Sequence, residues 1–97
     1  MLFTVNKSPF TSNSLQSCLK FAKSGNPVLL FEDGVFAAAK GTALEPLIRT
    51  AMTYVEIYAL QEDLTARGIT DVIAGVRLVD YGGFVDLVAQ NNVCPWT

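Results

Sequence analysis

The sequence predicts an α/β fold: a single compact domain with a parallel sheet of four or five strands flanked by helices. Short β-branched or aromatic runs alternate with helical patterns along the whole chain, and this alternation is typical of parallel sheets covered by helices. The segment "NPVLLF" contains a continuous apolar run after its asparagine, as in a strand buried on both faces. The 97 residues leave room for one core, so we expect residues 1–97 to form one domain.

The first half of the chain shows clear start and stop signals. The apolar run 2–5 is a strand that ends at a turn around Pro9. Helix-capping residues open "TSNSLQSCLKFAKSG", and its closing glycine predicts a helix over 11–25. Residues 26–31 form the apolar strand. The polar break "EDG" ends that strand and leads into a short helix, 35–41.

The second half continues the alternation. A helix over 42–53 carries its proline in the first turn, where the missing amide hydrogen is tolerated. The run "YVEIYAL", 54–60, is rich in strand-forming residues. A helix over 61–68 begins with two acids and ends in glycine. Strand 75–80 and helix 81–92 follow, and "VCPW" is either a last edge strand or a tail.

Composition and charge narrow the functional classes. Apolar residues make up 51% of the chain and charged residues 16%, so we expect apolar side chains outside the core, at interfaces with other subunits. The net charge of -2 without any basic run argues against direct nucleic-acid binding. No segment resembles a membrane span or a signal peptide. We therefore expect no membrane association, a cytoplasmic location and reduced cysteines.

The sequence lacks the residues that several common kinds of functional site require. There is no histidine, no CxxC and no phosphate-loop motif, so we expect no metal site, no cofactor and no histidine-dependent nucleophile. Gly82-Gly83 follows a strand and opens a helix, which favours close packing over phosphate binding. The acidic pairs Glu32-Asp33 and Glu62-Asp63 favour turn and helix-cap roles over general acid–base catalysis.

The thiols are the remaining candidate groups. Helical periodicity places Cys18 on the shoulder of the buried stripe Leu15, Leu19 and Ala22. Cys18 is then either a small core residue or a sulfur nucleophile, and the latter needs access and a lowered pKa. Cys94 is interpreted as an incidental residue of the tail or edge strand. Trp96 favours an anchoring role, on a neighbouring subunit or on the domain itself.

Together, five stretches of the chain resemble the TusB/DsrH family of sulfur-relay subunits, closer to its DsrH-like branch. They are "TVNKSP", "SLQSCLKFA", "VLLFEDGVFAA", "IYALQEDLTARGI" and "VDYGGFVDLV", in the family's order and at about its spacing. A tryptophan near the C-terminus also fits, and the resemblance covers essentially the whole chain. It implies a compact parallel α/β domain, in agreement with the pattern above.

The resemblance also implies a function. Such chains assemble with two related subunits, TusC/DsrF-like and TusD/DsrE-like, into a heterohexamer that carries sulfane sulfur as cysteine persulfide. A TusE/DsrC-like protein accepts the sulfur, for tRNA wobble-uridine 2-thiolation or for dissimilatory sulfur oxidation. "NKSPF" and "SCLKFA" favour the oxidation branch. The principal acceptor cysteine belongs to the TusD/DsrE-type subunit, so this chain is mainly structural, with Cys18 a candidate persulfide site.

Two other classes of function stay open from the sequence. The chain could be a stand-alone transferase or thiol enzyme, which requires a reactive Cys18 in the isolated protein. It could also be a non-catalytic interaction or ligand-binding module that uses the loops "EDG" and "DYGG". Those loops lie at carboxyl ends of strands, where open α/β sheets bind ligands.

Overall fold

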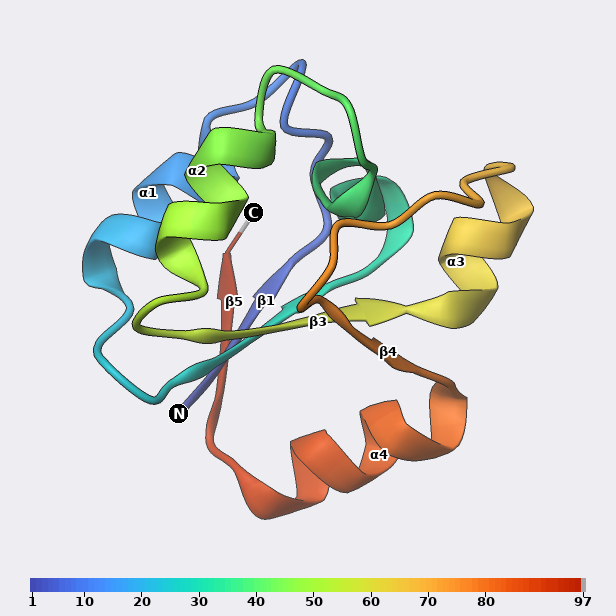
Figure 1. The fold of residues 1–97 in the computed structure, drawn as a ribbon. Coiled ribbons are helices and arrows are strands. Elements are labelled where there is room, and N and C mark those ends of the chain that lie inside the picture. Colours follow the sequence, from blue (N-terminus) through green and yellow to red (C-terminus); the bar gives the residue numbers. More distant parts are fainter. Residues whose placement is uncertain (97) are drawn as a thin grey trace.

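The computed structural model describes residues 1–96 and confirms the α/β prediction. All strand pairs are parallel, and the strand order is β4-β3-β2-β1-β5 (Figure 1). The elements in chain order are β1 Leu2–Val5, α1 Ser14–Phe21, β2 Pro27–Leu30, the 3-10 helix η1 Glu32–Ala38, α2 Glu45–Ala51, β3 Glu56–Leu60, α3 Gln61–Ala66, β4 Arg77–Val79, α4 Tyr81–Gln90 and β5 Val93–Trp96.

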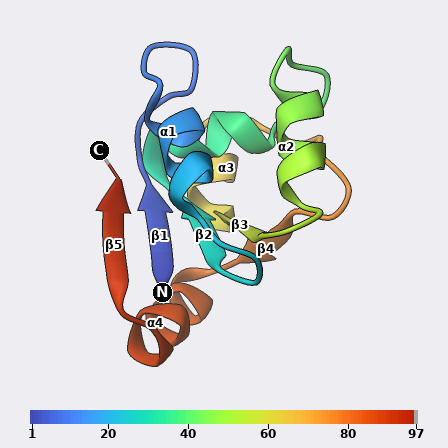
Figure 2. The same cartoon turned by 90° about the vertical axis from the view of Figure 1, so that its left-hand side faces the viewer.

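The order of the strands explains the layers. From β1 to β4 the chain moves across the sheet in one direction, and right-handed crossovers then place their helices on one face. The step from β4 back to β5 runs the opposite way, so α4 crosses the other face. Figures 1 and 2 show α1 and α2 together on one side and α4 alone on the other, with β5 at the edge beside β1.

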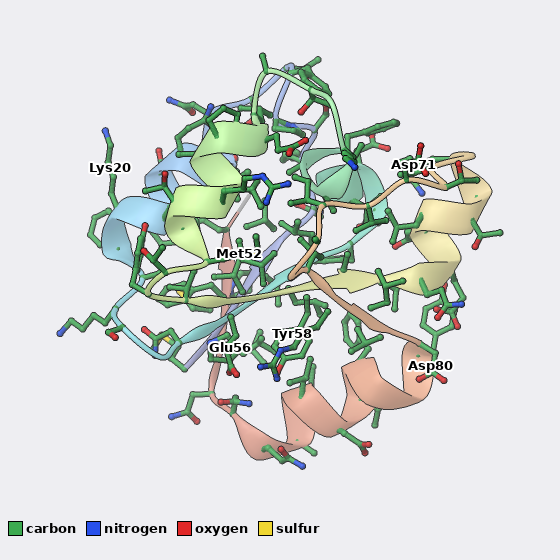
Figure 3. All side chains as sticks on the ribbon, viewed as in Figure 1. Lys20, Met52, Glu56, Tyr58, Asp71 and Asp80 are labelled. Atoms are coloured by element: carbon green, nitrogen blue, oxygen red, sulfur yellow. The ribbon has the colours of Figure 1, made fainter. Side chains whose placement is uncertain are left out.

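Alternate residues of the central strands fill the two faces. Val28 and Leu30 point into the core beneath the helices, while Leu29 points to the α4 side, and all three are fully buried. Phe84 of α4 packs edge-on against Phe31 with ring centroids 5.9 Å apart. The α4 layer is thin, however, because none of its residues is fully buried. In Figure 3 Tyr58 lies on this α4 side of the sheet.

Notable differences from the predicted elements occur after α1 and at "EDG", and the alternative left open for the final segment is resolved. The helix predicted to run to Gly25 ends at Phe21, and Gly25 adopts a φ of 85° in the turn before β2. The predicted break at "EDG" is instead the first turn of η1, which Glu32 enters with a φ of 48°. The final segment is a strand, since residues 93–96 pair with β1 along their whole length.

Candidate functional site

The acidic loops at the carboxyl ends of β2 and β3 are tied to each other. Asp63 Oδ2 accepts a 2.6 Å hydrogen bond from the backbone N–H of Glu32, at the start of η1. Arg67 Nε donates to Asp33 Oδ1 at 3.0 Å, and Arg67 Nη1 lies 3.6 Å from Asp63 Oδ1. These carboxylates neutralise Arg67 and cap a helix, and they do not converge on an open reaction centre; the helix that Asp63 caps is η1, whereas the sequence predicted a cap on its own helix.

A shallow cavity of about 350 Å³ lies beside them, where α3 meets the start of α4. It is lined by Gln61, Glu62, Thr65 and Asp80. Figure 3 labels Asp80 at the start of α4. Glu62 Oε2 accepts from the N–H of Tyr81 at 3.3 Å, and Asp80 Oδ1 accepts from the N–H of Gly83 at 2.8 Å. Because two carboxylates already occupy this helix terminus, the cavity is poorly suited to phosphate.

Gly82-Gly83 acts through packing. A Cβ at Gly83 would lie 3.1 Å from the Cβ of Val79, so the turn from β4 into α4 is tight. This supports the packing interpretation of the glycine pair.

Cys18 lies deeper than the periodicity predicted. Its side chain has no exposed surface and belongs to the main core cluster, rather than to the shoulder of α1. The reason is β5, since Cys94 and Trp96 cover the flank of α1 that would otherwise be solvent-facing. Burial raises the pKa of the Cys18 thiol to about 12, with a smaller contribution from the nearby Cys94. At neutral pH Cys18 is therefore a protonated thiol.

Cys94 is the residue whose position the sequence did not reveal. It pairs with Phe3 in the parallel register of β1 and β5, and its partly buried side chain packs on the core that contains Cys18. Both cysteines are free thiols. The strand-forming "VCPW" was the only signal available, and it did not specify β1 as the neighbour.

Trp96 anchors β5 to the domain. Its ring centroid lies 5.1 Å from that of Phe21 on α1 and 6.2 Å from that of Phe3 on β1. Of the two anchoring roles that the sequence left open, the structure shows the one on the domain itself.

Three further properties bear on function. Within residues 1–96 no three histidine, cysteine, aspartate or glutamate side chains are grouped closely enough to hold a metal ion. No helix in this described part is long and apolar enough to cross a bilayer. Large apolar side chains are nonetheless exposed, among them Leu78, Tyr81 and Val85 on β4 and α4.

The fold and its thiols define a class: a small, parallel α/β domain without histidine, whose candidate reactive groups are two neighbouring cysteines. A family model described as "DsrH like protein" matches residues 7–93. The chain is 37% identical over 92 residues to the protein TusB of Escherichia coli K12, covering 94% of both. It is 36% identical over 93 residues to TusB of Serratia proteamaculans, covering 95% of both.

This chain belongs to the TusB/DsrH family. A solved structure, the YchN protein of E. coli, shares the fold with a TM-score of 0.83 at 19% identity, over 97% of this chain and 96% of its own. Family membership implies a role in sulfur relay or tRNA thiolation, and partnership with TusC- and TusD-type subunits.

Proposed function

We propose that this chain is the TusB/DsrH-type subunit of a heterohexameric sulfur-relay complex in the cytoplasm. Its partners are TusC/DsrF-like and TusD/DsrE-like subunits, and a TusE/DsrC-like protein accepts the sulfur. The observation that carries the proposal is the family match over nearly the whole chain. The exposed apolar side chains on β4 and α4 support assembly with other subunits.

Within that complex the chain is mainly structural. Cys18 is the candidate persulfide site, but its buried and protonated thiol does not suit attack in the isolated domain. Direct access of a sulfur donor from solution to Cys18 would require α1 and β5 to separate. The same burial argues against the stand-alone thiol enzyme, which needs a reactive Cys18 without partners.

Co-expression tests the assembly. A tag on this chain should co-purify both partner subunits, and all three should elute together at the mass of a hexamer. A stable monomer that ignores both partners, while the partners assemble with each other, would contradict the proposal.

Mass spectrometry tests the sulfur chemistry on the reconstituted complex. After incubation with a sulfane-sulfur donor, we expect the TusD/DsrE-type chain to gain sulfur first. An adduct on this chain that is lost in Cys18→Ala and kept in Cys94→Ala would support the Cys18 site. If this chain gains no sulfur inside a complex whose other subunit does, Cys18 is a packing residue.

The pathway has its own test. The sulfur-oxidation branch, favoured by "NKSPF" and "SCLKFA", stays a prediction, whereas the two curated relatives compared above carry the name TusB. Expressing this chain with its partners in a tusB-deficient strain should restore 2-thiolated wobble uridine if it serves thiolation. Unchanged thiolation by a complex that assembles and carries sulfur would favour the oxidation branch.

The alternative is a non-catalytic interaction or ligand-binding module. The cavity that favours it lies between "QED" and "DYGG", so the predicted loop "EDG" is not part of its lining. Titration with cationic and nucleotide probes, followed by the amide signals of Tyr81 and Gly83, tests this alternative. Saturable shifts that Glu62→Gln abolishes would support it, and unchanged spectra would remove it.

A further inference from the structure

Both thiols of the chain lie in one packing interface, between α1 and β5. Cys94 is opposite Phe3 in the sheet, and Phe3 belongs to the same core cluster as Cys18. Helix α1 lies against both β1 and β5. Cys18 and Cys94 are therefore separated by 75 residues of sequence but lie on neighbouring elements that pack on the same core cluster.

The flanking aromatic residues fix how these two elements face each other. Phe21 is three residues after Cys18 on the helix, and Trp96 is two residues after Cys94 on the strand. Those spacings keep each pair on one face of its element. Since the rings of Phe21 and Trp96 are in contact, with centroids 5.1 Å apart, the faces that carry the two cysteines are turned toward each other.

The two thiols differ in accessibility. Cys18 has no exposed surface, whereas Cys94 is partly exposed on the edge strand. The pKa of Cys18 is raised to about 12, first by burial and then by the charge that Cys94 carries when ionised. That second effect agrees with the packing of Cys94 on the core cluster that contains Cys18. A reagent from solution therefore meets Cys94 first, with Cys18 behind it.

We propose that Cys94 and Cys18 form an attacking and resolving thiol pair, which closes a reversible intrachain disulfide when the chain meets a small-molecule disulfide. The Cys94 thiolate attacks one sulfur of glutathione disulfide, forms a mixed disulfide and releases one glutathione thiolate. Cys18 then loses its proton, attacks the Cys94 sulfur and displaces the second glutathione, which takes up a proton. Two protein thiols are oxidised, and one glutathione disulfide is reduced to two glutathiones.

This modification site does not depend on the sulfur-relay function. Its consequence for that function would be regulatory, because a Cys18–Cys94 disulfide leaves neither sulfur free to accept or pass on sulfane sulfur. The bond would also tie the edge strand β5 to α1, across the contact that Trp96 already makes.

The test uses the whole reduced chain with glutathione disulfide as the probe. In the wild type we expect a product lighter by two hydrogen atoms, in which tryptic peptides 8–20 and 78–97 are linked. Cys18→Ala should stop at a stable glutathione adduct on Cys94, and Cys94→Ala should stay unmodified while folded. Because closure needs the Cys18 thiolate, it should be about 100-fold faster near pH 9 than near pH 7.

Two outcomes would contradict the proposal that Cys94 and Cys18 act as a thiol pair. A wild type that keeps its glutathione adduct near pH 9, as Cys18→Ala does, would show that the thiols do not meet. Modification of Cys94→Ala as fast as the wild type would show that Cys18 is directly accessible. In denaturant both cysteines should react with glutathione disulfide at similar rates. This control shows that the reagent itself does not prefer either cysteine. If Cys18→Ala does not fold, the linked or unlinked wild-type peptides decide the question alone.

Discussion

At the scale of single residues, the fold controls the ionisation of Cys18. The pKa of its thiol is raised from an ordinary value near 9 to about 12 in the folded chain. Between those pH values the unfolded chain loses the proton and the folded chain keeps it. Below about pH 9 both forms are protonated, so the group contributes its full stabilisation there and loses it as the pH rises.

The prediction is a difference between the wild type and Cys18→Ala. Relative to Cys18→Ala, the free energy of unfolding of the wild type should fall by about 1.4 kcal/mol per pH unit between about pH 9 and pH 12. Urea titrations of both chains under reducing conditions measure this, and the variant controls for other groups that titrate there. Parallel pH profiles would contradict the burial that the structure shows.

Gly34 is a second residue with a specific physical demand. Its φ is not in the left-handed region, but a Cβ added there would lie 2.2 Å from the carbonyl oxygen of Val5. Only a glycine lets η1 approach the end of β1 this closely. Gly34→Ala should therefore destabilise the domain by about 3 kcal/mol, because backbone atoms must move apart.

Gly82→Ala is the matched control for that substitution. Its added Cβ would meet only the side-chain oxygen of Asp80, at 3.3 Å, and alanine is the better helix former. Thermal unfolding of both variants should show a large loss for Gly34→Ala and a change within about 1 kcal/mol for Gly82→Ala. Equal losses would mean that the close contact with β1 is not what demands glycine.

At the scale of elements, the cap of α4 is a sensitive point, since no residue of this helix is fully buried. Asp80 Oδ1 accepts from the N–H of Gly83 and satisfies one of the free amides at the helix start. Asp80→Ala should cost about 1 kcal/mol in the free energy of unfolding. Asp86→Ala removes an exposed charge from the same helix and should change stability much less, as chemical denaturation can show.

The types of the helices and strands could be predicted from the sequence, whereas several of their boundaries and the strand that pairs with β5 could not. The apolar run "VLLF" placed β2 to within a residue or so, and Pro46 lies in the first turn of α2 as predicted, although this helix begins at Glu45 rather than at residue 42. The 3-10 helix η1 could not be predicted, since it depends on tertiary contacts: Asp63 holds the N–H of Glu32, and Gly34 packs on β1. The pairing of β5 with β1 is equally non-local, and no periodicity encodes it.

That missed pairing also explains the error at Cys18. A helical wheel ranks the faces of α1 by sequence alone, and it placed the cysteine on the shoulder. In the fold, β5 returns from the far side of the sheet and covers this shoulder with Cys94 and Trp96. The two thiols are therefore brought together by the crossover from β4 to β5. Strand β5 begins 75 residues after Cys18 in the sequence.

At the scale of the whole molecule, stability should be uneven across the sheet. Strands β1, β2 and β3 have neighbours on both sides, whereas β4 and β5 are edges. The segment β4-α4-β5 closes the domain through a thin layer and the ring contacts of Trp96. This segment should open without global unfolding.

Native-state hydrogen exchange measures that difference. Amides of β2 and β3 should exchange only through global unfolding, while those of β5 should exchange through a smaller opening. Trp96→Ala removes the contacts with Phe3 and Phe21, so the opening free energy of β5 should fall by about 2 kcal/mol, roughly 30-fold in rate. Phe10→Ala, which removes an exposed ring on a loop, should leave β5 unchanged. If β5 is as protected as β2 in both variants, the edge is held by contacts other than this tryptophan, and the α1–β5 interface is more rigid than its packing indicates.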